Sequence, residues 1–268
     1  MPQAPGGGDG ALEETPSSAY TDASMTTLYT IPYSPWSEKA RWALDTAGIA
    51  YRESDFVPLF GGPGLRLRTG RWRGRLSAPF LVDGRRSVVD SFEIARWAVR
   101  RSGKTSLIPA EHAMAIEAWN ARSERIAEAS RVLVTAAIRH NPDVVPELVP
   151  SPLNRLGPVT RLLGATGARY LRWKYDFDLS DLNAAQEVIR DHLVTLREHI
   201  ASKEGPLLGT FTFADIAMAS VLQGVSPVAQ RFWPLGEHTR ACWRQGALAE
   251  EFADVLSWRD ETYEAYRR

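Results

Sequence analysis

Residues 26–101 and residues 111–268 show different patterns, and this difference limits the fold more than any other feature of the chain. The first segment alternates short β-rich runs with helical patterns, in the order strand, helix, strand, loop, hairpin, helix. The second shows amphipathic helical stretches broken by Gly and Pro, with no convincing strand. This order predicts an α/β N-terminal domain followed by an all-α C-terminal domain.

The first helix is the best marked element. A β-rich run covers residues 27–31, and Ser34 followed by Pro35 predicts an N-cap and the first helical residue. Gly48 is expected to supply a left-handed C-cap. A weaker strand is predicted over residues 51–56.

A hairpin and a second helix complete the N-terminal pattern. Residues 80–82 and 88–89 are β-rich and flank Asp83-Gly84, a hairpin signal. Ser91 is expected to cap the helix that follows.

The N-terminal tail differs from the rest of the chain. Its residues are rich in Gly, Pro, Ser and Thr, with no Lys or Arg and no apolar run, which predicts disorder and not a secretory signal. The predicted organisation is a tail over 1–24, an α/β domain over 25–103, a linker over 104–110 and an all-helical domain over 111–268.

The C-terminal half is expected to contain several helices, at about 111–140, 155–175 and 180–203. The four prolines of residues 141–152 predict a non-helical excursion. Further on, Thr212 and Asp215 form a capping-box pattern at the start of another helix.

Composition excludes several classes of function. The 32 basic and 32 acidic side chains balance, so no net field favours nucleic acid or an anionic membrane. Cys242 is the single cysteine, which excludes an internal disulfide and a multi-cysteine metal site, and it is expected to be buried. The five histidines show no metal-ligand spacing, and no apolar run is long enough for a transmembrane helix.

Three motifs carry a resemblance to a known family. They are residues 33–41 (YSPWSEKAR) at the first helix, 77–82 (SAPFLV) before a strand, and 89–92 (VDSF) at the second helix. In this order they resemble the thioredoxin-like domain of the cytosolic glutathione transferases, in the register of serine-type, theta- and tau-like bacterial members. The resemblance covers about residues 26–268 and implies a glutathione-binding domain followed by a substrate-binding domain.

The resemblance implies a role for each matching residue. Ser34 matches the active serine of the serine-type members. Pro79 matches a proline that is cis in the family, and Ala78 matches the residue whose backbone pairs with glutathione. Asp90 and Ser91 match the acidic-Ser pair that holds the γ-glutamyl end.

A serine at a helix N-terminus has chemistry that suits this role, although Ser34 is also explained as a helix cap alone. A hydroxyl donor and the positive end of a helix both favour a thiolate over a thiol. A hydrogen bond to a charged group contributes about 1.5–3 kcal/mol, and about 1.4 kcal/mol corresponds to one pKa unit. Ser37 and Tyr33 are secondary candidates, with satisfaction of the first helical turn and packing as their alternatives.

The five arginines of residues 65–75 allow several interpretations. One of them meets the glycine carboxylate of glutathione or an anionic substrate, or the segment is a solvated loop. The family often has an Asn-Pro and a lysine here, which this chain lacks. The aromatic group at 170–177 is a candidate wall for a second substrate.

The expected function is that of a glutathione transferase. Glutathione is the co-substrate, a small apolar electrophile is the partner, and no metal is required. The family also implies a cytoplasmic homodimer active in detoxification. The alternatives are a glutathione-dependent β-etherase or isomerase, a non-catalytic interaction module of the same fold, and a thiol other than glutathione.

Overall fold

The computed structural model describes residues 25–56, 77–148, 182–202 and 204–267. Several predictions lie outside these residues: the tail over 1–24, the arginines of 65–75, the helix expected over 155–175 and the aromatic group at 170–177.

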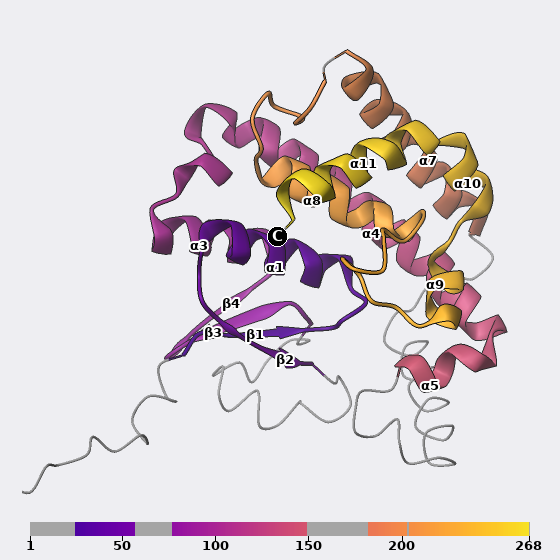
Figure 1. Ribbon diagram of the computed structural model, residues 1–268, viewed down its shortest axis with the longest axis horizontal. Helices are drawn as coiled ribbons and strands as arrows, with labels where there is room; N and C mark the ends of the chain where they lie inside the picture. Colours follow the sequence, from indigo (N-terminus) through magenta and orange to yellow (C-terminus); the bar gives the residue numbers. More distant parts are fainter. Residues whose placement is uncertain (1–24, 57–76, 149–181, 203, 268) are drawn as a thin grey trace, which may run out of the picture.

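A four-stranded mixed sheet forms the base of the N-terminal domain (Figure 1). Strand order is β2-β1-β3-β4, in which β1 pairs parallel with β2 and antiparallel with β3, and β3 pairs antiparallel with β4. The strands are β1 (Thr27–Thr30), β2 (Arg52–Asp55), β3 (Phe80–Asp83) and β4 (Arg86–Val89).

Two helices cover one face of this sheet, α1 (Pro35–Ala47) and α3 (Ser91–Ser102) (Figure 1). The predicted caps of α1 are confirmed. Ser34 is the N-cap, and Gly48 ends the helix with φ of 70°, a value that costs glycine little because it has no Cβ.

The hairpin turn lies one residue later than the sequence predicted. Asp83 is the last residue of β3 and pairs with Arg86, so the turn consists of Gly84 and Arg85. Gly84 takes the positive φ of 58° at the first turn position.

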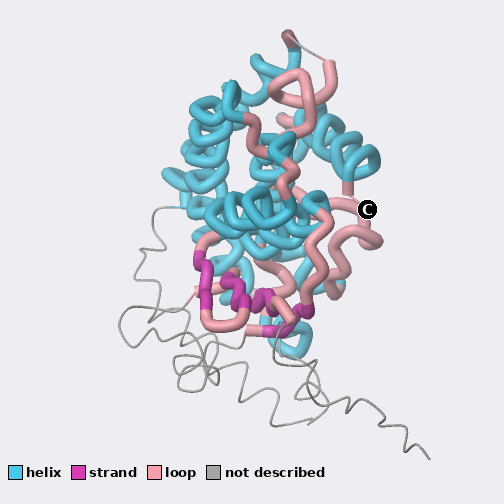
Figure 2. The backbone as a smooth tube through the Cα atoms, turned by 90° about the vertical axis from the view of Figure 1, so that its left-hand side faces the viewer, coloured by secondary structure: helices cyan, strands magenta, loops and turns pink. Residues whose placement is uncertain are grey.

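The C-terminal part is helical, and β4 is the last strand among the described residues. Figure 2 shows most of the helices on one side of the strands. The α-helices are α4 (Ala113–His140), α5 (Val145–Leu148), α7 (Leu182–Ala201), α8 (Phe213–Val221), α9 (Glu237–Trp243), α10 (Gly246–Glu251) and α11 (Ala253–Tyr266). Short 3-10 turns lie at Thr105–Leu107, Ala110–His112, Pro142–Val144 and Leu222–Gly224. The predicted fold class, a thioredoxin-like domain followed by a helical domain, is confirmed.

The prediction of a non-helical excursion over 141–152 was wrong for residues 142–148, and residues 149–152 lie outside the described residues. Residues 142–144 form a 3-10 turn and Val145–Leu148 form α5. Pro146 is tolerated because it lies in the first turn of α5, where a backbone N–H has no intrahelical acceptor.

A shared core joins the two parts of the chain. Trp42 of α1 packs against Tyr263 of α11 with ring centroids 4.5 Å apart, and Phe92 of α3 stacks on Phe213 of α8 at 5.0 Å. Helix α1 therefore lies between the sheet and the helical part (Figure 1).

The predicted capping box of α8 is confirmed. Thr212 is the N-cap, and the buried Asp215 carboxylate accepts the backbone N–H groups of Thr212 at 2.8 Å and Leu207 at 2.7 Å. Among the described residues, each helix is too short or too polar to cross a membrane.

Candidate functional site

The three motifs converge at one end of the sheet because of the strand register. Tyr29 of β1 pairs with Phe80 of β3, and Phe80 pairs with Val89 of β4. The residues just after β1, just before β3 and just after β4 are therefore neighbours. These positions hold the segment that leads to Ser34, the Ala78–Pro79 dipeptide and the Asp90–Ser91 pair.

Ser34 caps α1 and keeps its proton available. Its Oγ accepts the N–H of Ser37 at 3.4 Å, and its side chain is almost buried, at 8% exposed. An accepted bond uses a lone pair of the hydroxyl and leaves the O–H free to donate. In the described part of the chain, the structure records no acceptor for that proton. Capping and donation to a thiolate are therefore compatible.

The secondary candidates occupy other positions. Ser37 is fully buried, and its Oγ accepts the backbone N–H of Ile31 at 3.0 Å, so this hydroxyl braces the loop between β1 and α1. Tyr33 is half-buried and packs against the core shared by the two parts of the chain.

The Ala78–Pro79 peptide bond is cis, as the resemblance implies. Pro79 directly precedes β3, in which Phe80 stacks on Tyr29 with ring centroids 4.6 Å apart and an interplanar angle of 7°. The backbone of Ala78 is thereby anchored beside the end of β1.

Asp90, and not Ser91, is the N-cap of α3, which corrects the prediction by one residue. The Asp90 Oδ1 accepts the N–H groups of Phe92 at 2.8 Å and Glu93 at 3.2 Å. Asp90 has a φ of 83°, the one positive φ of a non-glycine residue in the described residues. Such strained backbone is found at functional sites more often than elsewhere.

Ser91 is the first helical residue, and its hydroxyl is left without a partner. The side chain is 1% exposed, and within the described residues its Oγ makes no hydrogen bond. An unsatisfied buried hydroxyl costs about 1–3 kcal/mol. A ligand atom that accepts from Ser91 would remove this cost.

Lys39 is a residue of this region that the sequence analysis missed. Its side chain is fully buried, and its Nζ donates to Ser123 Oγ at 2.8 Å and to Glu124 Oε1 at 2.6 Å. Burial lowers the pKa of Lys39, and the charges of Glu124 and Asp90 oppose that effect. A lysine within the apolar stripe of a helix was the available signal, because such a position needs a buried counter-charge.

Two other features of the described residues do not belong to the three motifs. Cys242 in α9 is 4% exposed, and burial raises the pKa of its thiol, which suits a structural cysteine. A cavity of about 540 Å³ opens between α4 and α7, beside Trp119 and His199. Its walls contain none of the motif residues.

The N-terminal sequence matches a family model. Residues 28–106 match the glutathione S-transferase N-terminal domain. The match is confined to the N-terminal part of the chain, which therefore resembles the N-terminal domain of that family. The theta- or tau-like subtype stays a prediction.

Solved glutathione S-transferase folds are similar over most of the chain. A beta-etherase, LigF, from Sphingobium sp. strain SYK-6 is 15% identical with a TM-score of 0.59, covering 89% of this chain and 95% of that one. A glutathione S-transferase from Methylobacterium radiotolerans JCM 2831, in complex with glutathione sulfonate, is 16% identical with a TM-score of 0.57, covering 90% and 91%. A family member from Pseudomonas fluorescens Pf-5 with bound glutathione is 21% identical with a TM-score of 0.53, covering 89% and 94%. At identities this low, the structural similarity establishes the fold alone. A comparison with curated proteins found no match.

Proposed function

We propose that this chain is a glutathione transferase that activates the glutathione thiol for attack on an apolar electrophile. The observation that carries the proposal is the convergence of Ser34, the Ala78–Pro79 dipeptide and the unpaired Ser91 hydroxyl at one end of the sheet. Glutathione bound in the Pseudomonas fluorescens family member supports the choice of thiol.

Ser34 acts on the sulfur in this proposal. Its hydroxyl donates to the thiolate, and the N-terminus of α1 adds a favourable partial positive charge. One such charged hydrogen bond, at about 1.5–3 kcal/mol, corresponds to a thiol pKa lowered by about one to two units. The thiolate then forms a bond to the electrophilic carbon, and the leaving group departs with the electron pair of the broken bond.

The γ-glutamyl end of glutathione lies at the start of α3. The Ser91 hydroxyl donates to the α-carboxylate, which also faces the N-terminus of the helix. Asp90 uses Oδ1 for both of its capping bonds, so Oδ2 meets the α-ammonium group. The backbone of Ala78, held before the cis Pro79, pairs with the backbone of the peptide.

The remaining assignments rest on the family resemblance. Residues 25–103 bind glutathione, residues 104–110 link the domains, and residues 111–268 form the substrate-binding domain. Two chains pair as a cytoplasmic homodimer whose role is detoxification, and no metal takes part.

A glutathione-dependent β-etherase is the second candidate, supported by the similarity in fold to the Sphingobium enzyme. The same thiolate would attack the carbon that bears an aryl ether, and a phenolate would leave. Incubation with a β-aryl ether and with an activated aryl halide distinguishes the two, because only ether cleavage releases a phenol from the first compound.

Calorimetric titration with glutathione tests the site itself. We expect Ser91→Ala to weaken binding about tenfold or more, as loss of one hydrogen bond to a charged group predicts. Ser220→Ala is the matched control, because Ser220 of α8 is also fully buried with an unpartnered hydroxyl but lies within the helical core. The affinity of the Ser220→Ala variant for glutathione should stay within about twofold of that of the unmodified protein.

Two results count against the proposal. Equal effects of Ser91→Ala and Ser220→Ala would mean that Ser91 does not contact glutathione. Absence of binding at millimolar glutathione would favour the non-catalytic interaction module.

A further inference from the structure

The turn that leads to Ser34 is held by groups from both parts of the chain. The Ser34 N–H donates to the Ile31 carbonyl at 3.0 Å, which closes a four-residue turn with Pro32 at its second position. The Pro32 carbonyl accepts the indole N–H of Trp233 at 3.1 Å and an N–H of the Arg41 guanidinium at 3.3 Å.

The Pro32 carbonyl belongs to the central peptide bond of this turn. In type I and type II turns this peptide points in opposite directions, and a flip changes the backbone angles on both sides of it. Two donors on one carbonyl therefore hold the peptide in one orientation. They also define the direction in which the chain leaves the turn toward Ser34.

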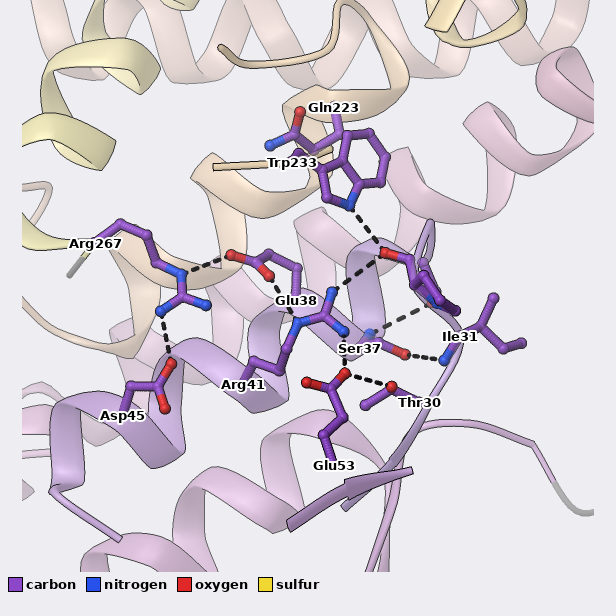
Figure 3. Close-up of polar contacts among 12 residues, drawn as sticks. Thr30, Ile31, Ser37, Glu38, Arg41, Asp45, Glu53, Gln223, Trp233 and Arg267 are labelled. Carbon is purple, nitrogen blue, oxygen red and sulfur yellow. Dashed lines mark hydrogen bonds and ion pairs between the residues drawn. The ribbon is translucent and has the colours of Figure 1, made fainter. Parts of the chain in front are cut away.

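Arg41 is itself held by two carboxylates, the buried Glu38 and the exposed Glu53, as Figure 3 shows. Its Nε donates to Glu38 at 3.0 Å, and a terminal nitrogen donates to Glu53 at 2.8 Å. Glu53 also accepts the Thr30 hydroxyl at 2.5 Å, at the end of β1. The planar guanidinium thus has its position set before it reaches Pro32.

Arg267, which follows α11, extends this network. Glu38 is 2% exposed and also accepts from Arg267 at 2.8 Å, while Arg267 donates to Asp45 at 2.6 Å (Figure 3). An unbroken series of ion pairs therefore runs from Arg267 through Glu38 to Arg41, which donates to the turn before Ser34.

Trp233 reaches the turn from the helical part of the chain. It lies between α8 and α9, its side chain is 2% exposed, and its ring meets Trp243 edge-on at 5.0 Å. Packing on this scale leaves the indole no freedom to move away from Pro32.

We propose that Trp233 and Arg41 are positioning residues of the thiol site, which hold the central peptide of the Ile31–Ser34 turn so that the Ser34 hydroxyl points at the sulfur. The inference rests on the proposed function. Hydrogen bonds weaken steeply as their angle departs from linearity, so a peptide flip two residues before Ser34 would weaken the bond to the thiolate. In this proposal the helical part of the chain completes the thiol site by supplying the indole N–H of Trp233 to the Pro32 carbonyl.

Titration of bound glutathione tests this, with the ultraviolet absorbance of its thiolate recorded against pH. Trp233→Phe keeps a large buried ring and removes only the N–H donor. We expect the pKa of the bound thiol to rise by about one unit, which reduces the thiolate fraction near neutral pH up to tenfold. Affinity for glutathione, measured at a pH below the pKa of the bound thiol, should change less than about threefold, because the ligand is bound there as the thiol and the bond to a thiolate does not contribute.

Trp258→Phe is the matched control. The Trp258 indole also donates to a backbone carbonyl, that of Gly205 at 3.1 Å, and its side chain is 8% exposed. Trp258→Phe removes the same kind of hydrogen bond at another place in the chain and should leave the pKa of the bound thiol unchanged.

Arg41→Lys is a second variant in case Trp233→Phe does not fold. A lysine keeps the charge opposite Glu38 but cannot reach both carboxylates and Pro32, so the thiol pKa should rise again.

Ser34→Ala distinguishes the role of the Ser34 hydroxyl from the positioning roles of Trp233 and Arg41. If Ser34→Ala raises the thiol pKa while Trp233→Phe and Arg41→Lys leave it at the value of the unmodified protein, the positioning inference alone is overturned. If Ser34→Ala itself has no effect on the thiol pKa, the proposed role of Ser34 fails, and the inference fails with it.

Discussion

The Lys39 ammonium lies 2.6 Å from the Glu124 carboxylate, and this ion pair joins α1 to α4. The lysine is fully buried, whereas 31% of the Glu124 side chain is exposed. Glu124 also accepts the indole N–H of Trp36 at 2.5 Å, so one carboxylate holds two side chains of the helix that Ser34 caps.

Glu124→Gln should destabilise the protein by about 3 kcal/mol, because it leaves a buried ammonium without a counter-charge. Urea unfolding measures the change. Glu117→Gln is the control, since its partner Arg96 also joins α3 to α4 but both side chains are exposed, 36% for Arg96 and 56% for Glu117. That substitution should cost no more than about 1 kcal/mol.

The loss in Glu124→Gln should shrink as pH rises. Burial already lowers the pKa of Lys39, and removal of Glu124 removes the largest opposing charge. A lysine with a lowered pKa binds fewer protons in the folded state than in the unfolded state, so stability increases with pH up to the unfolded value of about 10.4. Equal losses at neutral and alkaline pH would contradict this account.

Ser34→Ala should leave the fold intact and lower conjugation activity at least about tenfold, the effect of about one pKa unit or more in the thiol. Turnover with an activated aryl halide and far-ultraviolet circular dichroism measure the two properties. The fold is expected to survive because replacement of an N-cap serine costs about 1 kcal/mol. Unchanged turnover would refute a role for this hydroxyl in thiol activation.

Asp215→Ala should be among the most destabilising substitutions in the helical part. The buried carboxylate accepts from Leu207, from the Thr212 backbone and from the Thr212 hydroxyl at 3.2 Å. Loss of the capping box together with two unpaired N–H groups, those of Leu207 and Thr212, predicts about 2–4 kcal/mol, measured by urea unfolding. Asp215→Asn retains an acceptor and should cost less, and equal losses would show that charge matters more than hydrogen-bond acceptance.

Glu147 should make part of the stability dependent on pH. Partial burial alone would raise the pKa of Glu147, but hydrogen bonds from Thr239 and from the His238 backbone lower it overall. These bonds, at 2.6 and 2.7 Å from Thr239 and 3.1 Å from His238, tie Glu147 to the start of α9. A lowered folded pKa adds stability that is present above the unfolded value of about 4.3 and is lost as pH falls through the folded pKa.

Thermal unfolding of Glu147→Gln checks this. Its melting temperature should lie below that of the unmodified protein at neutral pH, and the gap should close in acid. A gap that stays constant down to acidic pH would show that the Glu147 charge does not contribute.

Helix ends could be predicted from the sequence where the cap is made by neighbouring residues. Ser34 and Gly48 mark the ends of α1, and Thr212 with Asp215 starts α8, because a cap is made by atoms a few residues apart. The cap of α3 was placed one residue late. Asp90 takes a positive φ there, which single-residue preferences disfavour.

The sequence alone determined the order of strands and helices, the caps of α1 and α8, and which side chains could bind or activate a thiol. Tertiary structure decided which distant groups meet. Lys39 finds its counter-charge 85 residues away, and the Pro32 carbonyl finds its indole donor 201 residues away. Caps follow from local backbone geometry, whereas the partner of a buried charge or carbonyl depends on which helix packs opposite it.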